Sequence, residues 1–68
     1  MLVKTLLKRC GTGFDRVIVA DSTSGHTMEF SSVKDAQIVA GGDRIVSWEV
    51  GVYEGDYEHM IFVLFITV

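Results

Sequence analysis

The chain has 68 residues, a formal net charge of −3 and a composition that is 49% hydrophobic and 22% charged. This length allows a single domain, residues 1–68, and the apolar content excludes an intrinsically disordered chain. Cys10 is the only cysteine, which excludes an internal disulfide. Binding to duplex DNA without sequence preference is also disfavoured, because it requires many clustered cationic contacts to phosphates.

The first segment, residues 2–10, is predicted to form a short helix. Its apolar side chains recur at the spacing of one buried helical stripe. These residues are Val3, Leu6, Leu7 and Cys10. We therefore expect the Cys10 thiol to pack as a small hydrophobic group rather than to react.

Two strands are predicted next, over residues 15–21 and 26–31. The β-branched run of the first favours a strand, and the second alternates between apolar and polar side chains. The polar stretch between them ends in Gly25, which is typical of a turn. Together these segments predict an antiparallel hairpin.

The middle of the chain is predicted to be a polar connector over residues 31–36, with room for one helical turn capped by Ser31 or Ser32. Residues 37–40 follow as a short strand or edge segment. A long strand over 44–53 and its antiparallel return over 57–67 then form a second hairpin.

The last nine residues, 60–68, are apolar on both faces of the predicted strand, because alternate side chains point to opposite sides. A domain of this size buries only about 60% of the surface that its unfolded chain exposes, so it is marginal alone. We therefore expect a homo-oligomer, whose interface takes the apolar side chains that face away from the helix. These are Ile61, Val63 and Phe65.

The order helix, hairpin, connector, hairpin predicts an α+β fold. A short N-terminal helix would pack on a four- to five-stranded, mostly antiparallel sheet. The C-terminal apolar run is too short for a membrane span, which needs about 20 residues, so no membrane partner is expected. The lone thiol and the missing secretory signal predict a location in a reducing cytosol.

No motif for catalysis, a metal or a cofactor is found. Nucleophilic catalysis needs a nucleophile and a base that a third group orients, and nothing here supplies that set. The acidic turn near His59 has too few metal ligands, and strand geometry sends Glu58 and His59 to opposite faces. We expect a protein that is not an enzyme.

Aromatic and charged residues near the second hairpin are the candidate binding residues. Tyrosine and tryptophan dominate the energy of protein interfaces, and an acidic rim favours a basic partner. The candidates are Trp48, Tyr53, Glu54, Asp56, Tyr57 and Glu58, with Arg16 and Arg44 as cations for a small ligand. Trp48 has two interpretations, an anchor in the core or a contact surface.

Five short stretches carry a resemblance to a group of known proteins: LLKRC, DRVIVAD, MEFSS, IVSWEV and the apolar IFVLFI. In this order they resemble small uncharacterised accessory proteins encoded by phages and prophages of Gram-positive bacteria. The resemblance implies an accessory role in the cytoplasm of a bacterial host, such as inhibiting a host defence by binding an effector or by sequestering a nucleotide signal. It carries over no functional residue.

Three functions therefore stay open. The first is inhibition of a host defence protein by direct binding. The second is an oligomeric sponge that holds a small nucleotide, with Trp48 or a tyrosine stacking on the base and Arg16, Arg44 or Lys34 contacting the phosphates. The third is a structural or assembly component.

Overall fold

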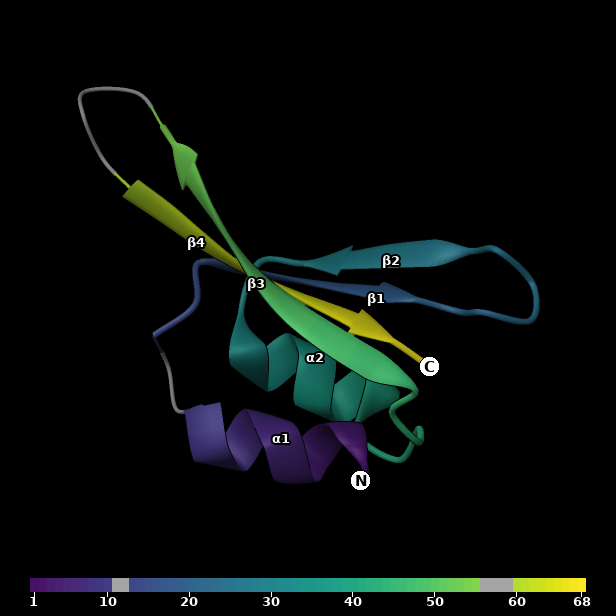
Figure 1. Cartoon of the computed structure of the whole chain (residues 1–68). Helices are drawn as coiled ribbons and strands as arrows, with labels where there is room; N and C mark the ends of the chain where they lie inside the picture. Colours follow the sequence, from purple (N-terminus) through teal and green to yellow (C-terminus); the bar gives the residue numbers. More distant parts are fainter. Residues whose placement is uncertain (11–12, 56–59) are drawn as a thin grey trace.

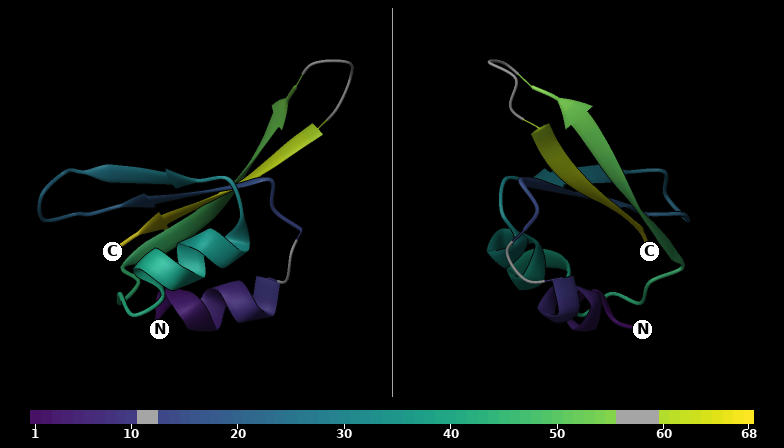
Figure 2. Two further views of the ribbon diagram at one scale, coloured as in Figure 1. Left: turned by 180° about the vertical axis from the view of Figure 1, so that it is seen from behind. Right: turned by 60° about the vertical axis from the view of Figure 1, so that its left-hand side comes forward.

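The computed structural model describes residues 1–10, 13–55 and 60–68. Its elements in chain order are α1 (Val3–Cys10), β1 (Arg16–Ala20), β2 (Thr27–Phe30), α2 (Val33–Ala40), β3 (Ser47–Glu54) and β4 (Met60–Thr67) (Figure 1). Both helices lie on one side of the sheet, and the β3–β4 hairpin extends beyond them (Figure 2). The predicted α+β fold with a leading helix is confirmed.

The sheet is mixed and has the strand order β2-β1-β4-β3. The two hairpins are antiparallel, as predicted, whereas β1 and β4 pair in parallel from Arg16 opposite Val63 to Ala20 opposite Thr67. Asp15 joins these strands at their start. Its backbone N–H donates to the Phe62 carbonyl, and its carboxylate accepts from the Phe62 N–H, both at 2.9 Å.

The core lies between the helices and the two central strands. From α1 it takes the predicted stripe, with Val3, Leu6 and Leu7 buried and Cys10 packed against them. From the sheet it takes the side chains of β1 and β4 that face the helices. These are Val17, Val19, Leu64 and Ile66. The expectation that Cys10 packs as a hydrophobic group agrees with this position.

Helix α2 replaces the predicted connector and short strand, so the strand expected over residues 37–40 is wrong. The Ser32 hydroxyl caps the helix by accepting a hydrogen bond of 3.2 Å from the Asp35 N–H. Val33, Ala36 and Ala40 then fall on one helical face and are buried against the sheet. A capping serine and helical spacing outweighed the β-branched residues of this segment.

Candidate interaction surface

Strand β3 is the candidate site, because it forms one edge of the sheet and presents two different faces. Residues directly opposite one another in an antiparallel pair point to the same side. Trp48 lies opposite Ile66, which belongs to the core beneath the helices. Trp48 therefore points to the helix side, and Tyr53, at odd spacing from it, points to the open side that carries no helix.

The helix side of β3 is apolar, and the helices leave much of it exposed. Val50 and Val52 follow Trp48 on this side, and Phe62 and Met60 continue it onto β4. These five side chains are 42–56% exposed, although the neighbouring Leu64 is completely buried. We call them the β3 apolar patch. Large contiguous apolar patches on folded domains are typical of surfaces that contact another molecule.

The open side of β3 is built around Gly51. The rings of Tyr53 and Phe65 pack edge to face above it, with centroids 6.2 Å apart and planes at 67°. A Cβ atom at Gly51 would lie 2.9 Å from a ring carbon of each. Glycine is therefore required for the rings to approach the strand, and Phe65 supports the half-exposed Tyr53.

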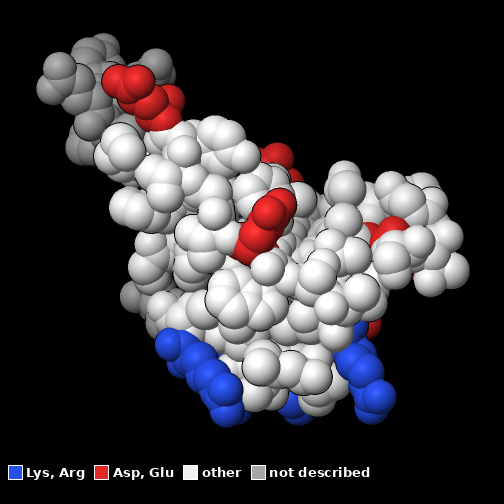
Figure 3. Space-filling view, viewed as in Figure 1, with Lys and Arg blue, Asp and Glu red and all other residues white. Residues whose placement is uncertain are grey.

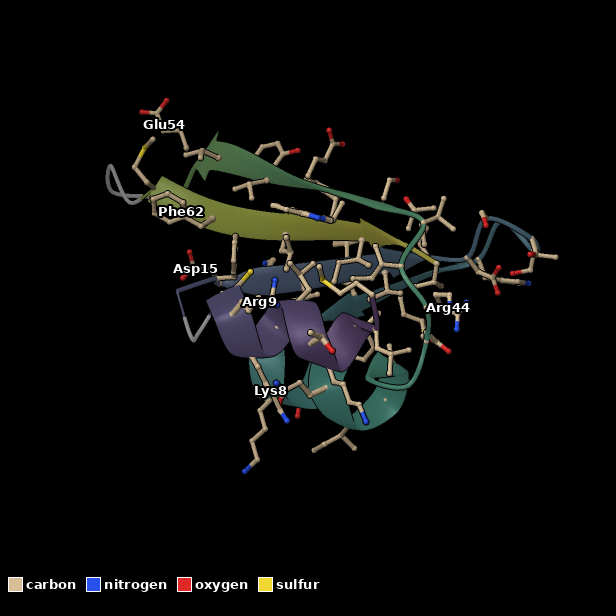
Figure 4. The ribbon with its side chains drawn as sticks, turned by 60° about the horizontal axis from the view of Figure 1, so that its bottom comes forward. Lys8, Arg9, Asp15, Arg44, Glu54 and Phe62 are labelled. Carbon is tan, nitrogen blue, oxygen red and sulfur yellow. The ribbon has the colours of Figure 1, made fainter. Side chains whose placement is uncertain are left out.

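Acidic side chains accompany this open side and the outer end of the hairpin. Glu49, opposite Phe65, is exposed on the open side, and Glu54, opposite Met60, is exposed on the helix side at the outer end. Figure 3 shows an acidic side chain near the outer end of the hairpin and lysine and arginine side chains along the bottom of the view. Glu54 and Phe62 lie at one end of the sheet, and Arg44 lies at the opposite end (Figure 4). Arg44 thus lies beyond one end of β3 and Glu54 lies at the other, and the exposed Asp43 lies beside Arg44.

The two predicted arginines do not join the aromatic residues. Arg16, on β1, forms an ion pair with Glu29 of β2, and both side chains are about half exposed. Arg44 precedes β3 and makes an isolated backbone bridge with Leu2. Since Trp48 and Tyr53 also point to opposite sides of the sheet, these four residues do not form one pocket.

The remaining predicted residues divide into two groups. Ile61, Val63 and Phe65 point to the open side, as expected, but Val63 is only 4% exposed within the single chain, and the other two are half-buried. Asp56, Tyr57 and Glu58 lie outside the described residues. The expected interface at Ile61 and Phe65 stays a prediction.

Sequence reasoning missed most of the β3 apolar patch. Val50 and Val52 alternate with other residues as in any half-buried strand, and that pattern is typical of core positions. The exposure arises because β3 is an edge strand, beyond the helices, and no local pattern reports strand order. Gly51 was a possible signal, since glycine inside a strand often marks a close approach.

Other polar clusters in the described part of the chain are structural. The Asp21 carboxylate accepts from the N–H groups of Thr23 (2.8 Å) and Ser24 (3.3 Å) in the β1–β2 turn. The Thr23 hydrogen bond is the main reason that the pKa of Asp21 lies below its usual value. Among residues 1–10, 13–55 and 60–68, no three potential metal ligands come together.

Comparison with protein-family models, curated proteins and solved structures found no match for this chain. Within the described residues, neither helix has the length and apolar character that crossing a membrane requires.

Proposed function

We propose that this chain is a non-enzymatic binding protein that recognises another protein through the open side of β3. The observation that carries this proposal is the Tyr53–Phe65 pair above Gly51. It holds an exposed tyrosine ring in a fixed position at low cost in side-chain entropy. Rigid aromatic side chains of this kind act as anchors in protein interfaces.

The charges beside this anchor indicate the kind of partner. Glu49 is exposed on the same open side, Glu54 follows Tyr53 at the end of the strand, and the whole chain is acidic. Complementary charge speeds association and selects partners, so a basic protein surface fits best. The resemblance to phage accessory proteins makes a bacterial defence effector with a nucleic-acid-binding surface the first partner to test. Steric blocking of that surface would inhibit it.

The test is affinity capture with the tagged chain from the lysate of a Gram-positive host, followed by binding measurements on the purified partner. Tyr53→Ala should weaken binding by about 2 kcal/mol, or roughly 30-fold, if Tyr53 is an interface anchor. Glu49→Gln and Glu54→Gln should slow association and reduce its dependence on salt. Asp35→Asn removes an exposed acid from α2 and is the matched control.

Unchanged affinity in the Tyr53→Ala variant, with normal folding by circular dichroism, would contradict this assignment. A partner whose binding weakens as much in Asp35→Asn as in Glu49→Gln would also contradict it, because net charge alone would then explain the effect.

The nucleotide-sponge hypothesis has less support from the geometry. Arg16 is already paired with Glu29, and Arg44 precedes the start of β3 whereas Tyr53 lies near its end. A sponge would gain stability from its ligand by mass action, by about 2.7 kcal/mol at a ligand concentration 100 times the Kd. A thermal-shift screen against cyclic nucleotides therefore separates the two hypotheses.

A further inference from the structure

The edge formed by β3 lacks the usual protection against pairing with another strand. Edge strands of soluble proteins are commonly short, or carry lysine, proline or a bulge. β3 is eight residues long, has the sequence SWEVGVYE and contains neither lysine nor proline. The opposite edge, β2, has only four residues. One side of β3 is also apolar, so pairing along this edge would bury both backbone groups and side chains.

We propose that two copies of this chain pair through β3 in antiparallel orientation, about a two-fold axis that passes midway between the two Val50 residues (an axis through Val50, for short). The two sheets then continue into each other. In this register Trp48 lies opposite Val52 of the second copy, on the helix side. An aromatic residue opposite a β-branched residue is a favourable cross-strand pair, and symmetry forms this pair twice.

The charges along β3 favour a second copy over another occupant of this edge. Arg44 precedes the strand, and Glu54 is its last residue. Antiparallel pairing about Val50 brings the end of the strand that Arg44 precedes beside the end of the second copy that carries Glu54. The same arrangement recurs at the other end of the interface. Arg44 and Glu54 of the second copy are therefore opposite charges at each end of the interface, although the exposed Asp43 also lies beside Arg44.

The position of Glu49 selects the register of this pairing. An axis through Glu49 would place two Glu49 side chains directly opposite each other, and like charges in that position destabilise a strand pair. An axis through Val50 instead puts Glu49 opposite Gly51 of the second copy, where the strand carries no side chain. Val50 then faces its own counterpart.

Disulfide trapping tests this register directly. Opposite residues of an antiparallel pair have Cα atoms about 4.5–5.5 Å apart, which suits a disulfide. In a Cys10→Ala background, Val50→Cys should form a covalent dimer rapidly under mild oxidation. Met28→Cys, on the helix side of the opposite edge and 43% exposed, is the matched control and should remain largely monomeric. Equal rates of cross-linking in the two variants would overturn the proposal.

Light scattering on the purified, otherwise unmodified chain tests the association itself. We expect a dimer that Val50→Lys converts to a folded monomer, because two lysines would meet on the axis, whereas Met28→Lys should remain dimeric. Arg44→Glu and Glu54→Arg should each weaken the dimer at least several-fold, and the double exchange should restore it. A monomer at every concentration would overturn the proposal. So would a dimer that survives Val50→Lys but is lost in Ile61→Lys. No binding partner is present in these measurements, so they are independent of the proposed function.

Discussion

Replacing Gly51 by alanine tests the aromatic pair that anchors the proposed binding surface. The added Cβ atom would lie 2.9 Å from Phe65 Cε2, 2.9 Å from Tyr53 Cε2 and 3.3 Å from Tyr53 Oη. Real Cβ atoms do not approach carbon so closely, so at least one ring must move. Tyr53 is 51% exposed and moves more easily than Phe65, which is less exposed.

The expected effect is a balance of three contributions. Overpacking costs about 1–3 kcal/mol, at the lower end here because Tyr53 can swing outward. Loss of the aromatic pair costs about 0.5–1.5 kcal/mol. Removing a glycine from a strand recovers about 0.4–1 kcal/mol of backbone entropy. We expect a net destabilisation of about 1 kcal/mol, which lowers Tm by about 4–8 °C in a domain of this size.

Urea unfolding followed by circular dichroism measures this quantity in Gly51→Ala, Tyr53→Ala and the double variant. Gly51→Ala should lower the free energy of unfolding by less in the Tyr53→Ala background, because one of the two ring contacts has gone. The difference between the two backgrounds, which is the coupling energy, should be about 0.5 kcal/mol or more. Gly42→Ala is the control, since its Cβ would meet no atom within 4 Å. A Gly51→Ala variant as stable as the natural chain, or additive effects in the double variant, would refute the packing described for this site.

Three further predictions concern the scaffold. Ser32→Ala should cost about 1 kcal/mol by removing the cap of α2, whereas Ser31→Ala, at the preceding exposed position, should cost little in the same unfolding assay. Leu64→Ala should cost about 2–5 kcal/mol, because the side chain is fully buried in the central strand; a half-folded or unfolded chain at 25 °C by circular dichroism is expected, and a cost below about 1 kcal/mol would contradict the core assignment. The lowered pKa of Asp21 stabilises the fold above the pKa of the unfolded chain, near 3.9, and this contribution is lost as pH falls through the folded-state pKa. Asp21→Asn, which can keep the turn, should therefore show a flatter dependence of unfolding midpoint on pH below about 4, and identical pH profiles would refute the hydrogen-bonded turn.

Local patterns predicted most elements of the fold. The helical stripe of α1 and the two hairpins each depend on neighbours in sequence, so spacing and turn residues were sufficient. The predicted strand over residues 44–53 is observed as Ser47–Glu54, and its partner begins at Met60 within the described residues. Helix α2 was missed because its Ile38 and Val39 favour strands locally, whereas Val33, Ala36 and Ala40 pack against the sheet only in the folded chain.

The candidate site was less predictable. Alternation in β3 correctly separated Trp48 from Tyr53, because side-chain direction is a property of the strand itself. It could not show which side was covered, since that depends on where the helices lie and on the position of β3 at the edge. The parallel pairing of β1 with β4 decides the place of the helices and the edge position of β3. The paired residues are far apart in sequence, so no local pattern predicts their pairing.

The position of β4 also has a consequence for how the chain is made. It is the last strand in chain order, yet it lies between β1 and β3 and joins the two hairpins into one sheet. During synthesis on the ribosome, both helices and the first hairpin emerge well before Met60–Thr67, and β3 has no strand to pair with until that segment follows. Pairings between such distant residues slow folding and prolong the exposure of unpaired strands. A chain that stops before Met60 would therefore lack the strand that joins β1 to β3, and the cell's proteases should remove it quickly.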